Sequence, residues 1–152
     1  MILTLVQAFI FLSYIIFLMI RFKGPLPSIS ESWYKLGYPG DILFTLFCWI
    51  LGFTMAFRGD ISSLFFFSGA GLLFVGAATM FKNKITSTVH FIGAGSGIIF
   101  ALLGILSAYG NPYPIIGWVI ITLLIYLLKV KNHMWWIEIA AFLGVIIGLF
   151  IS

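Results

Sequence analysis

Six stretches of mainly apolar residues follow one another along the chain, and each is about long enough to cross a bilayer. They cover residues 2–20, 42–57, 61–81, 85–108, 113–128 and 134–151, and none carries a charge near its middle. The connections are short apart from residues 21–41. This pattern predicts an all-α integral membrane protein, in which residues 1–152 form a single polytopic domain: a compact bundle of six transmembrane helices.

The connection formed by residues 21–41 contains the signals of one further, short helix. Ser28 and Glu31 have the S-x-x-E spacing of a capping box, and Gly37 supplies a helix stop. The residues between them are rich in Trp and Tyr, which prefer the headgroup level of a membrane. We therefore expect an interfacial helix over about residues 29–36.

Composition supports a membrane protein independently of the pattern. Hydrophobic residues make up 62% of the chain and charged residues 8%, with a mean hydropathy of +1.21. A soluble domain carries about 25% charged residues, so a soluble protein is excluded. The single cysteine, Cys48, excludes an intrachain disulfide.

The formal net charge of +4 has a lopsided distribution. With six spans, only Arg58 falls on one side of the membrane, and seven basic residues fall on the other: Arg21, Lys23, Lys35, Lys82, Lys84, Lys129 and Lys131. Short cytoplasmic loops retain Lys and Arg. We therefore predict a cell inner membrane protein with loops 21–41, 82–84 and 129–133 cytoplasmic and both termini outside. Nucleic acid is not an expected partner.

Small residues gather in the third and fourth stretches and predict close helix packing, in the centre of the bundle or at an oligomer contact. The positions expected to serve it are Gly69, Gly71, Gly76, Gly93, Gly95 and Gly97. Alternatively, the glycines of the fourth stretch loosen that helix, so that its carbonyl groups line a cavity.

Ionisable residues in or beside membrane spans are costly, which makes them candidate functional residues. Glu31, Asp41, His90 and Glu138 all lie toward the predicted cytoplasmic side and are the candidate binding residues. Asp41 also precedes a helix and is a candidate N-cap. A hydrogen bond between His90 and Glu138 that only holds two helices together is an equal alternative.

Three functions fit these residues, and the first is a membrane-embedded, metal-dependent hydrolase acting on lipid at the cytoplasmic interface. Its candidate metal ligands are His90, His133, Glu138 and Asp41, and its candidate catalytic groups are His90, Glu138, Ser28 and Ser32. Zinc is expected only under this alternative; otherwise we predict no cofactor.

This combination of Ser, Asp and His in helices is similar to that of the superfamily that includes alkaline ceramidases and adiponectin receptors. The chain departs from that superfamily in having only two His, no H-x-x-x-H pair near its end, and six spans in place of seven. We therefore do not assign the chain to it.

The second function, which we favour, is permeation. Dividing the chain after residue 81 gives a 3+3 arrangement of opposite orientation, and the middle span of each half is the shortest, as at transport sites. Coupled transport is not favoured because no series of buried ionisable residues crosses the bundle. The sequence thus predicts an oligomeric channel-type or regulatory membrane protein with a polar mouth on the cytoplasmic side.

The third function is that of an accessory subunit whose Phe-rich faces bind another membrane protein. The expected partners are accordingly the lipid bilayer and either further copies of the chain, forming a homo-oligomer, or a different membrane protein.

Overall fold

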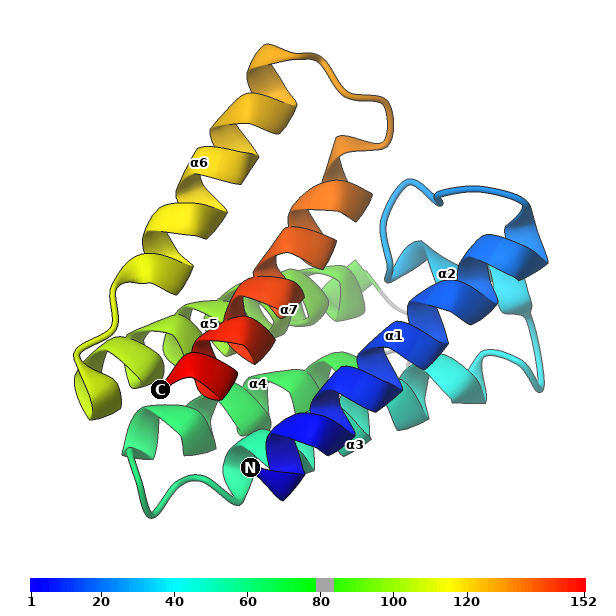
Figure 1. The fold of residues 1–152 in the computed structure, drawn as a ribbon. Helices are drawn as coiled ribbons and strands as arrows, with labels where there is room; N and C mark the ends of the chain where they lie inside the picture. Colours follow the sequence, from blue (N-terminus) through cyan, green and yellow to red (C-terminus); the bar gives the residue numbers. More distant parts are fainter. Residues whose placement is uncertain (79–83) are drawn as a thin grey trace.

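The computed structural model describes the backbone of residues 1–78 and 84–152, and the side chains of residues 1–78 and 89–152. Within these ranges the chain forms helices and no strand (Figure 1). The helices are α1 (Ile2–Phe22), α2 (Glu31–Leu36), α3 (Ile42–Ala56), α4 (Ser63–Ala78), α5 (Lys84–Tyr109), α6 (Tyr113–Leu127) and α7 (His133–Ile151).

The all-helical prediction is confirmed, and three helices support the membrane prediction by their length and apolar character. These are α1, residues Val89–Tyr109 of α5, and α7. The other apolar helices, α3, α4 and α6, have 15 or 16 described residues each. The predicted end of the third span at residues 79–81, and Lys82 after it, lie outside the described residues.

Helix α2 forms where the capping signals predict a helix, but it begins two residues later. Ser28 Oγ accepts a hydrogen bond from the backbone N–H of Glu31 at 3.1 Å, which is half of a capping box. The chain leaves α2 at Gly37, whose φ of 62° is in the left-handed region that glycine adopts without strain. Thus α2 closes the first loop against the start of α3.

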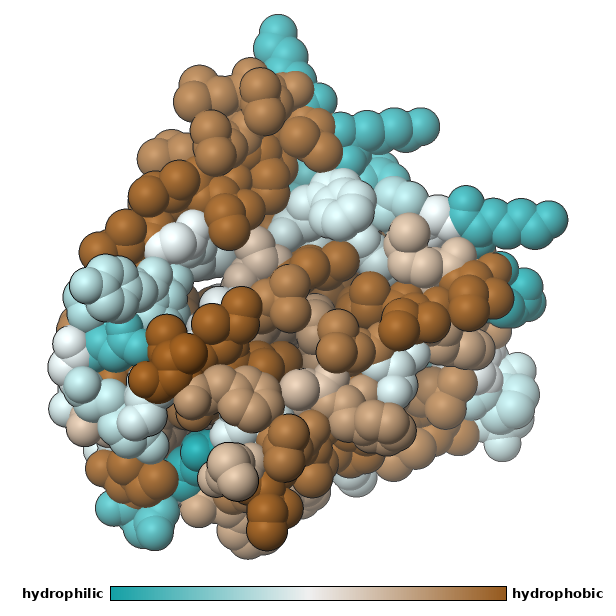
Figure 2. Space-filling view, viewed as in Figure 1, coloured by the Kyte–Doolittle hydropathy of each residue, from teal (hydrophilic) through white to brown (hydrophobic). Residues whose placement is uncertain are grey.

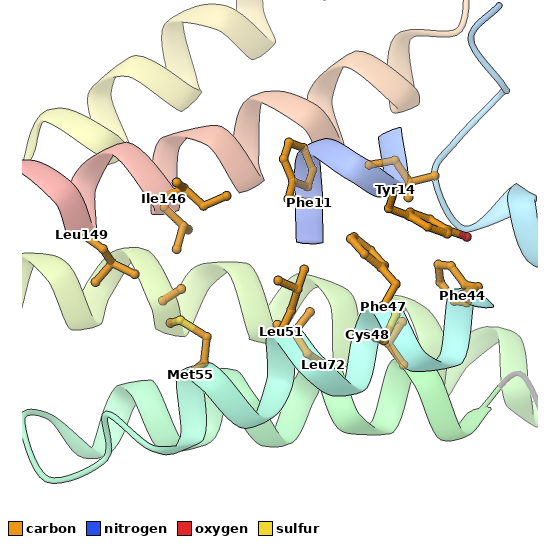
Figure 3. Packing of buried hydrophobic residues seen from close by; sticks show 14 of the residues in the cluster. Phe11, Tyr14, Phe44, Phe47, Cys48, Leu51, Met55, Leu72, Ile146 and Leu149 are labelled. Atoms are coloured by element: carbon orange, nitrogen blue, oxygen red, sulfur yellow. The ribbon is translucent and has the colours of Figure 1, made fainter. Parts of the chain in front are cut away.

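Two layers of helices enclose the core (Figure 1). Helices α3, α4 and α5 lie side by side and form one layer. Helices α1 and α7 form the second layer, and α6 packs against α7. Figure 3 shows Phe11 of α1 and Ile146 of α7 facing Leu51 and Met55 of α3 across the interface between the layers. All four side chains are buried, so the core lies between the layers.

Glycines bring the backbones of α3, α4 and α5 close together. A Cβ atom added to Gly69 of α4 would lie 2.6 Å from the backbone nitrogen of Ala56 on α3. On the opposite side of α4, a Cβ added to Gly71 would lie 2.8 Å from the carbonyl oxygen of Gly93 on α5. Small residues thus give α4 two packing faces. Helices in a membrane associate through such close contacts because lipid provides no hydrophobic driving force between them.

The other glycines singled out from the sequence divide between packed and open positions. Gly76 lies against Trp49 and Cys48 of α3, and Gly97 lies against Ser68 and Leu72 of α4. A Cβ at Gly95 would have no atom within 4 Å, so this glycine faces outward and takes no part in the packing.

The two halves of the chain are packed differently. Helix α3 lies in the core and buries residues along its whole length, whereas α6 buries only Pro114 and Ile125. The middle helices of a 3+3 division therefore occupy unlike environments, although each is short.

Hydrogen bonds show which turns share an end of the bundle. Asn111, between α5 and α6, donates to Ser152 at the C-terminus, and Arg58, between α3 and α4, donates to Thr4 at the start of α1. We call this the terminal end. Asn132, between α6 and α7, donates to the Pro25 carbonyl in the first loop, which defines the opposite, first-loop end. The apolar helices therefore alternate in direction (Figure 1).

The surface is apolar over the helices and polar at the ends. Figure 2 shows apolar side chains over α6, α7 and α1, and long hydrophilic side chains projecting beside the first loop and the α6–α7 turn. Large exposed apolar residues occur on every long helix. A continuous surface of this kind matches lipid as its surroundings.

The contrast between Gly69 and Gly95 provides a test of the glycine packing. Gly69→Ala should lower the free energy of unfolding by about 1–3 kcal/mol, because backbone atoms of α3 would have to move. Gly95→Ala, the matched control, should be neutral or stabilising by up to about 1 kcal/mol because alanine favours the helix. Thermal unfolding in detergent measures both, and equal stability of the two variants would contradict this packing.

Candidate functional site

The first loop is fixed on the N-terminal turns of α7. Asn132 Nδ2 donates to the carbonyl oxygen of Pro25 at 2.8 Å, and the backbone N–H of Trp135 donates to the carbonyl oxygen of Pro27 at 3.2 Å. The first N–H groups of a helix have no partner within it, so the loop carbonyl satisfies one of them. Trp135 is completely buried beneath this loop. The loop thereby becomes part of the core at the first-loop end.

Four residues from three segments form a series of hydrogen bonds there. Ser32 Oγ donates to the carbonyl oxygen of Ile29, so the 2.8 Å bond between Tyr14 and Ser32 has the Tyr14 hydroxyl as donor. The backbone N–H of Ile29 in turn donates to Glu138 Oε2 at 2.5 Å. We call Tyr14, Ile29, Ser32 and Glu138 the Glu138 cluster.

Apolar and weakly polar side chains surround the cluster. The Tyr14 ring stacks on Phe47 with centroids 4.4 Å apart and planes 18° from parallel. Buried Cys48, one position further along α3, lies within electrostatic range of both Tyr14 and Glu138. Figure 3 shows Tyr14, Phe47 and Cys48 together between α1 and α3. The cluster is therefore a small polar group within an aromatic environment.

Glu138 has unused capacity to accept hydrogen bonds. Among the described residues its carboxylate takes part in one hydrogen bond, the bond from Ile29, and no basic side chain contacts it. An ionised carboxyl group accepts about four hydrogen bonds. In an apolar helix, such a group is expected to bind a proton, a cation or a hydrogen-bond donor.

The remaining polar residues of the first loop serve local structure. Ser28 Oγ accepts a hydrogen bond from the backbone N–H of Glu31 and lies 3.0 Å from Ser30 Oγ, with which it forms a second hydrogen bond. Asp41 occupies the predicted N-cap position of α3, but it has helical backbone angles and its side chain makes no capping hydrogen bond. Its Oδ1 is buried and has no hydrogen-bond partner in the described chain.

The structure does not gather the two histidines around Glu138. His90 packs against Phe44 with ring centroids 6.2 Å apart, and His133, the first residue of α7, lies beside Tyr126 at 5.5 Å. No hydrogen bond joins His90 to Glu138 in the described part of the chain. Nor do any three His, Cys, Asp or Glu side chains described by the structure stand close enough to hold one metal ion.

Sequence reasoning missed the polar face of α1. Thr4, Gln7 and Tyr14 are all buried on one side of this helix, together with Phe11 and Leu18. The spacing of these five positions alternates between three and four residues, which is the signature of one helical face. This signal is readable in the sequence, but the apolar stretch as a whole conceals it.

Arg58 is the one basic residue on the terminal side in the six-span prediction, and the structure explains this exception. Its side chain is 6% exposed and donates from Nη2 to Thr4 Oγ1 at 2.5 Å. Burial lowers the pKa of the Arg58 guanidinium, an effect that nearby Tyr109 opposes. Arg58 is thus a structural residue folded onto α1, and it does not act as a free loop charge.

No family model, curated protein or solved structure matches this chain. The site must therefore be interpreted from its own geometry.

The hydrogen bond from Tyr14 provides the first test of the Glu138 cluster. Tyr14→Phe keeps the ring on Phe47 but leaves Ser32 Oγ without its donor, so it should cost about 0.5–1.5 kcal/mol. Tyr34→Phe, at a position 71% exposed, is the matched control and should change stability little. Thermal unfolding compares them, and a neutral Tyr14→Phe would show that the bond contributes nothing.

Proposed function

We propose that the chain is a six-span membrane protein of permeation type, with the Glu138 cluster at its cytoplasmic mouth. The alternating direction of the apolar helices supports six spans, and so does the location of both termini at one end. The described residues of α3, α4 and α6 span about 22–24 Å at 1.5 Å per residue, and tilting or local thinning of the bilayer accommodates short spans.

The basic residues support an orientation with the first-loop end in the cytoplasm. Arg21, Lys23 and Lys35 belong to the first loop or its flanks, and Lys129 and Lys131 belong to the α6–α7 turn. These loops meet through Asn132 and Pro25. Since Arg58 is folded into the bundle, no free basic side chain at the described terminal end opposes this orientation.

The observation that carries the proposal is the Glu138 carboxylate. It lies in an apolar helix, is partly buried, has no basic partner among the described residues and is connected to Tyr14 through Ile29 and Ser32. A purely structural carboxylate is expected to be paired or fully hydrogen-bonded. Glu138 instead keeps acceptor positions for a permeating proton, cation or hydrogen-bond donor.

Phe11, Phe47 and Phe142 form an aromatic layer that closes the interior on the side of the Glu138 cluster facing the terminal end. The rings of Phe11 and Phe142 lie 5.3 Å apart, and those of Phe47 and Phe142 lie 5.9 Å apart. Along α1, Phe11 separates Tyr14 from Gln7. We interpret the structure as a closed state, in which the aromatic layer must move before a solute passes along the polar face of α1.

A homo-oligomer remains part of the proposal, because α6 packs mainly on α7 at the edge of the bundle and exposes apolar residues to lipid or to a second copy. The accessory-subunit alternative would use the same helix. The hydrolase alternative receives no support from the positions of His90, His133 and Asp41 relative to Glu138.

Cysteine labelling tests the orientation. Cys48 is the only cysteine and is buried, so the unmodified chain provides a background of low reactivity. On intact cells, a membrane-impermeant maleimide should label Asp60→Cys, whereas Lys131→Cys should react only after permeabilisation; both positions are exposed. Labelling of Lys131→Cys from outside would overturn the orientation, and equal labelling of both would overturn the six spans.

Flux measurements in liposomes test permeation, with protons, K⁺ and glycerol as probes. Phe142→Ala should raise the flux of at least one probe by about tenfold, which corresponds to a barrier lower by ~1.4 kcal/mol. Combining it with Glu138→Gln, which retains an acceptor for Ile29 but removes the charge, should reverse most of this gain. Phe150→Ala, on the exposed side of the same helix, is the matched control. Permeation is rejected if Phe142→Ala liposomes leak no faster than protein-free liposomes.

A further inference from the structure

Exposed basic side chains from two separate segments meet at the first-loop end. Two of them lie at the end of α1 and two lie in the turn after α6. The 2.8 Å hydrogen bond from Asn132 to the Pro25 carbonyl joins these segments, because it links the α6–α7 turn to the first loop. We call the four basic residues the loop-junction surface: Arg21, Lys23, Lys129 and Lys131.

The positive charge of this surface exceeds what the described part of the protein provides to balance it. No ion pair joins the four basic side chains to an acidic side chain within the described residues. The C-termini of α1 and α6 each contribute the equivalent of about half a negative charge, and the N-terminus of α7 offsets one of them. Four cations therefore remain largely uncompensated, and the partner that complements them is anionic.

The backbone at this junction has an unusual conformation. Three non-glycine residues of the described chain have φ in the left-handed region, and all three lie here: Lys23 at 55°, Lys129 at 49° and Asn132 at 55°. Glycine is the common residue where a helix ends in this conformation, because a Cβ atom adds strain. The ends of α1 and α6 thus each carry a lysine at a position that favours glycine.

Apolar side chains lie next to these cations on the same helices. Ile20 of α1 is 74% exposed, and Leu127 and Leu128 at the end of α6 are 76% and 73% exposed. Figure 2 shows the apolar surface of α6 and α1 continuing up to the long hydrophilic side chains. A phospholipid has the same order of groups, a charged phosphate followed by acyl chains, whereas a soluble anion offers nothing to the apolar part.

We propose that the loop-junction surface binds an anionic phospholipid, whose phosphate contacts basic side chains of both segments and whose acyl chains lie along the exposed face of α6. The bound lipid adds to the hydrogen bond between Asn132 and Pro25 and holds the α6–α7 turn on the first loop. Lysine and arginine near a membrane surface attract anionic headgroups in this way. The site depends neither on permeation nor on the orientation of the chain, since it requires only a membrane location.

Native mass spectrometry of the purified protein in neutral detergent tests this site, with phosphatidylglycerol and phosphatidylcholine as probes. Phosphatidylglycerol should bind more tightly, and Lys131→Gln should weaken its binding by about fivefold, the effect of one lysine at an anionic surface. Lys131→Arg keeps the charge and should bind as the unmodified protein does. Equal affinity for the two lipids would overturn the proposal, and so would displacement of the bound lipid by inorganic phosphate at equal concentration.

Two further variants separate a defined site from general attraction by positive charge. Lys35→Gln removes the same charge from an exposed position of α2, which packs on α3, and should weaken binding of phosphatidylglycerol much less than Lys131→Gln. Asn132→Gly keeps every charge and the left-handed backbone but removes the bond to Pro25, and it should weaken binding. Equal losses for Lys35→Gln and Lys131→Gln, or unchanged binding by Asn132→Gly, would reject the loop-junction surface as the site.

Discussion

The close approach of α4 to its two neighbours is the interaction on which the rest of the structure depends. Lipid provides no hydrophobic driving force between helices, so contact must come from packing and hydrogen bonds. Gly69 and Gly71, two residues apart, turn opposite sides of α4 toward α3 and α5. The bond from Ser68 to the Gly97 carbonyl strengthens one of these contacts. A flat layer of three helices results, against which α1 and α7 can pack.

The second layer is held by polar contacts at both of its ends. At the terminal end, Arg58 reaches from the turn after α3 to Thr4 of α1. At the first-loop end, the loop carbonyls of Pro25 and Pro27 bind the start of α7, and Tyr14 of α1 bonds Ser32. Each contact satisfies a group that would otherwise be buried without a partner, which gives the loop and the turn a defined place in the fold.

Between these ends, the interior alternates between polar and aromatic levels along α1. Thr4 and Gln7 come first, Phe11 follows within the aromatic layer, and Tyr14 leads to Glu138. In an apolar bundle, each polar level needs a hydrogen-bonding partner, whether protein, water or a passing solute. This arrangement is the physical basis for the proposed closed permeation path.

The sequence by itself determined the helical class, the approximate helix bounds and the apolar surface. Long apolar stretches and capping signals act locally, so their effect can be read without knowing which segments meet. It also indicated Glu138 and Ser32, because charged and hydroxyl side chains beside apolar stretches are conspicuous.

Only the tertiary structure decided which of these groups meet. Glu138 binds the backbone N–H of Ile29, a residue 109 positions away that carries no polar side chain. His90 and Asp41 share the same side of the predicted membrane, yet neither bonds to the cluster: the His90 ring packs against Phe44, and Asp41 Oδ1 has no hydrogen-bond partner in the described chain. Gln7 is buried against residues of four other helices around a small cavity, and its amide oxygen has no hydrogen-bond partner among the described residues. Contacts of this kind depend on helix rotation and loop path, which hydropathy does not encode.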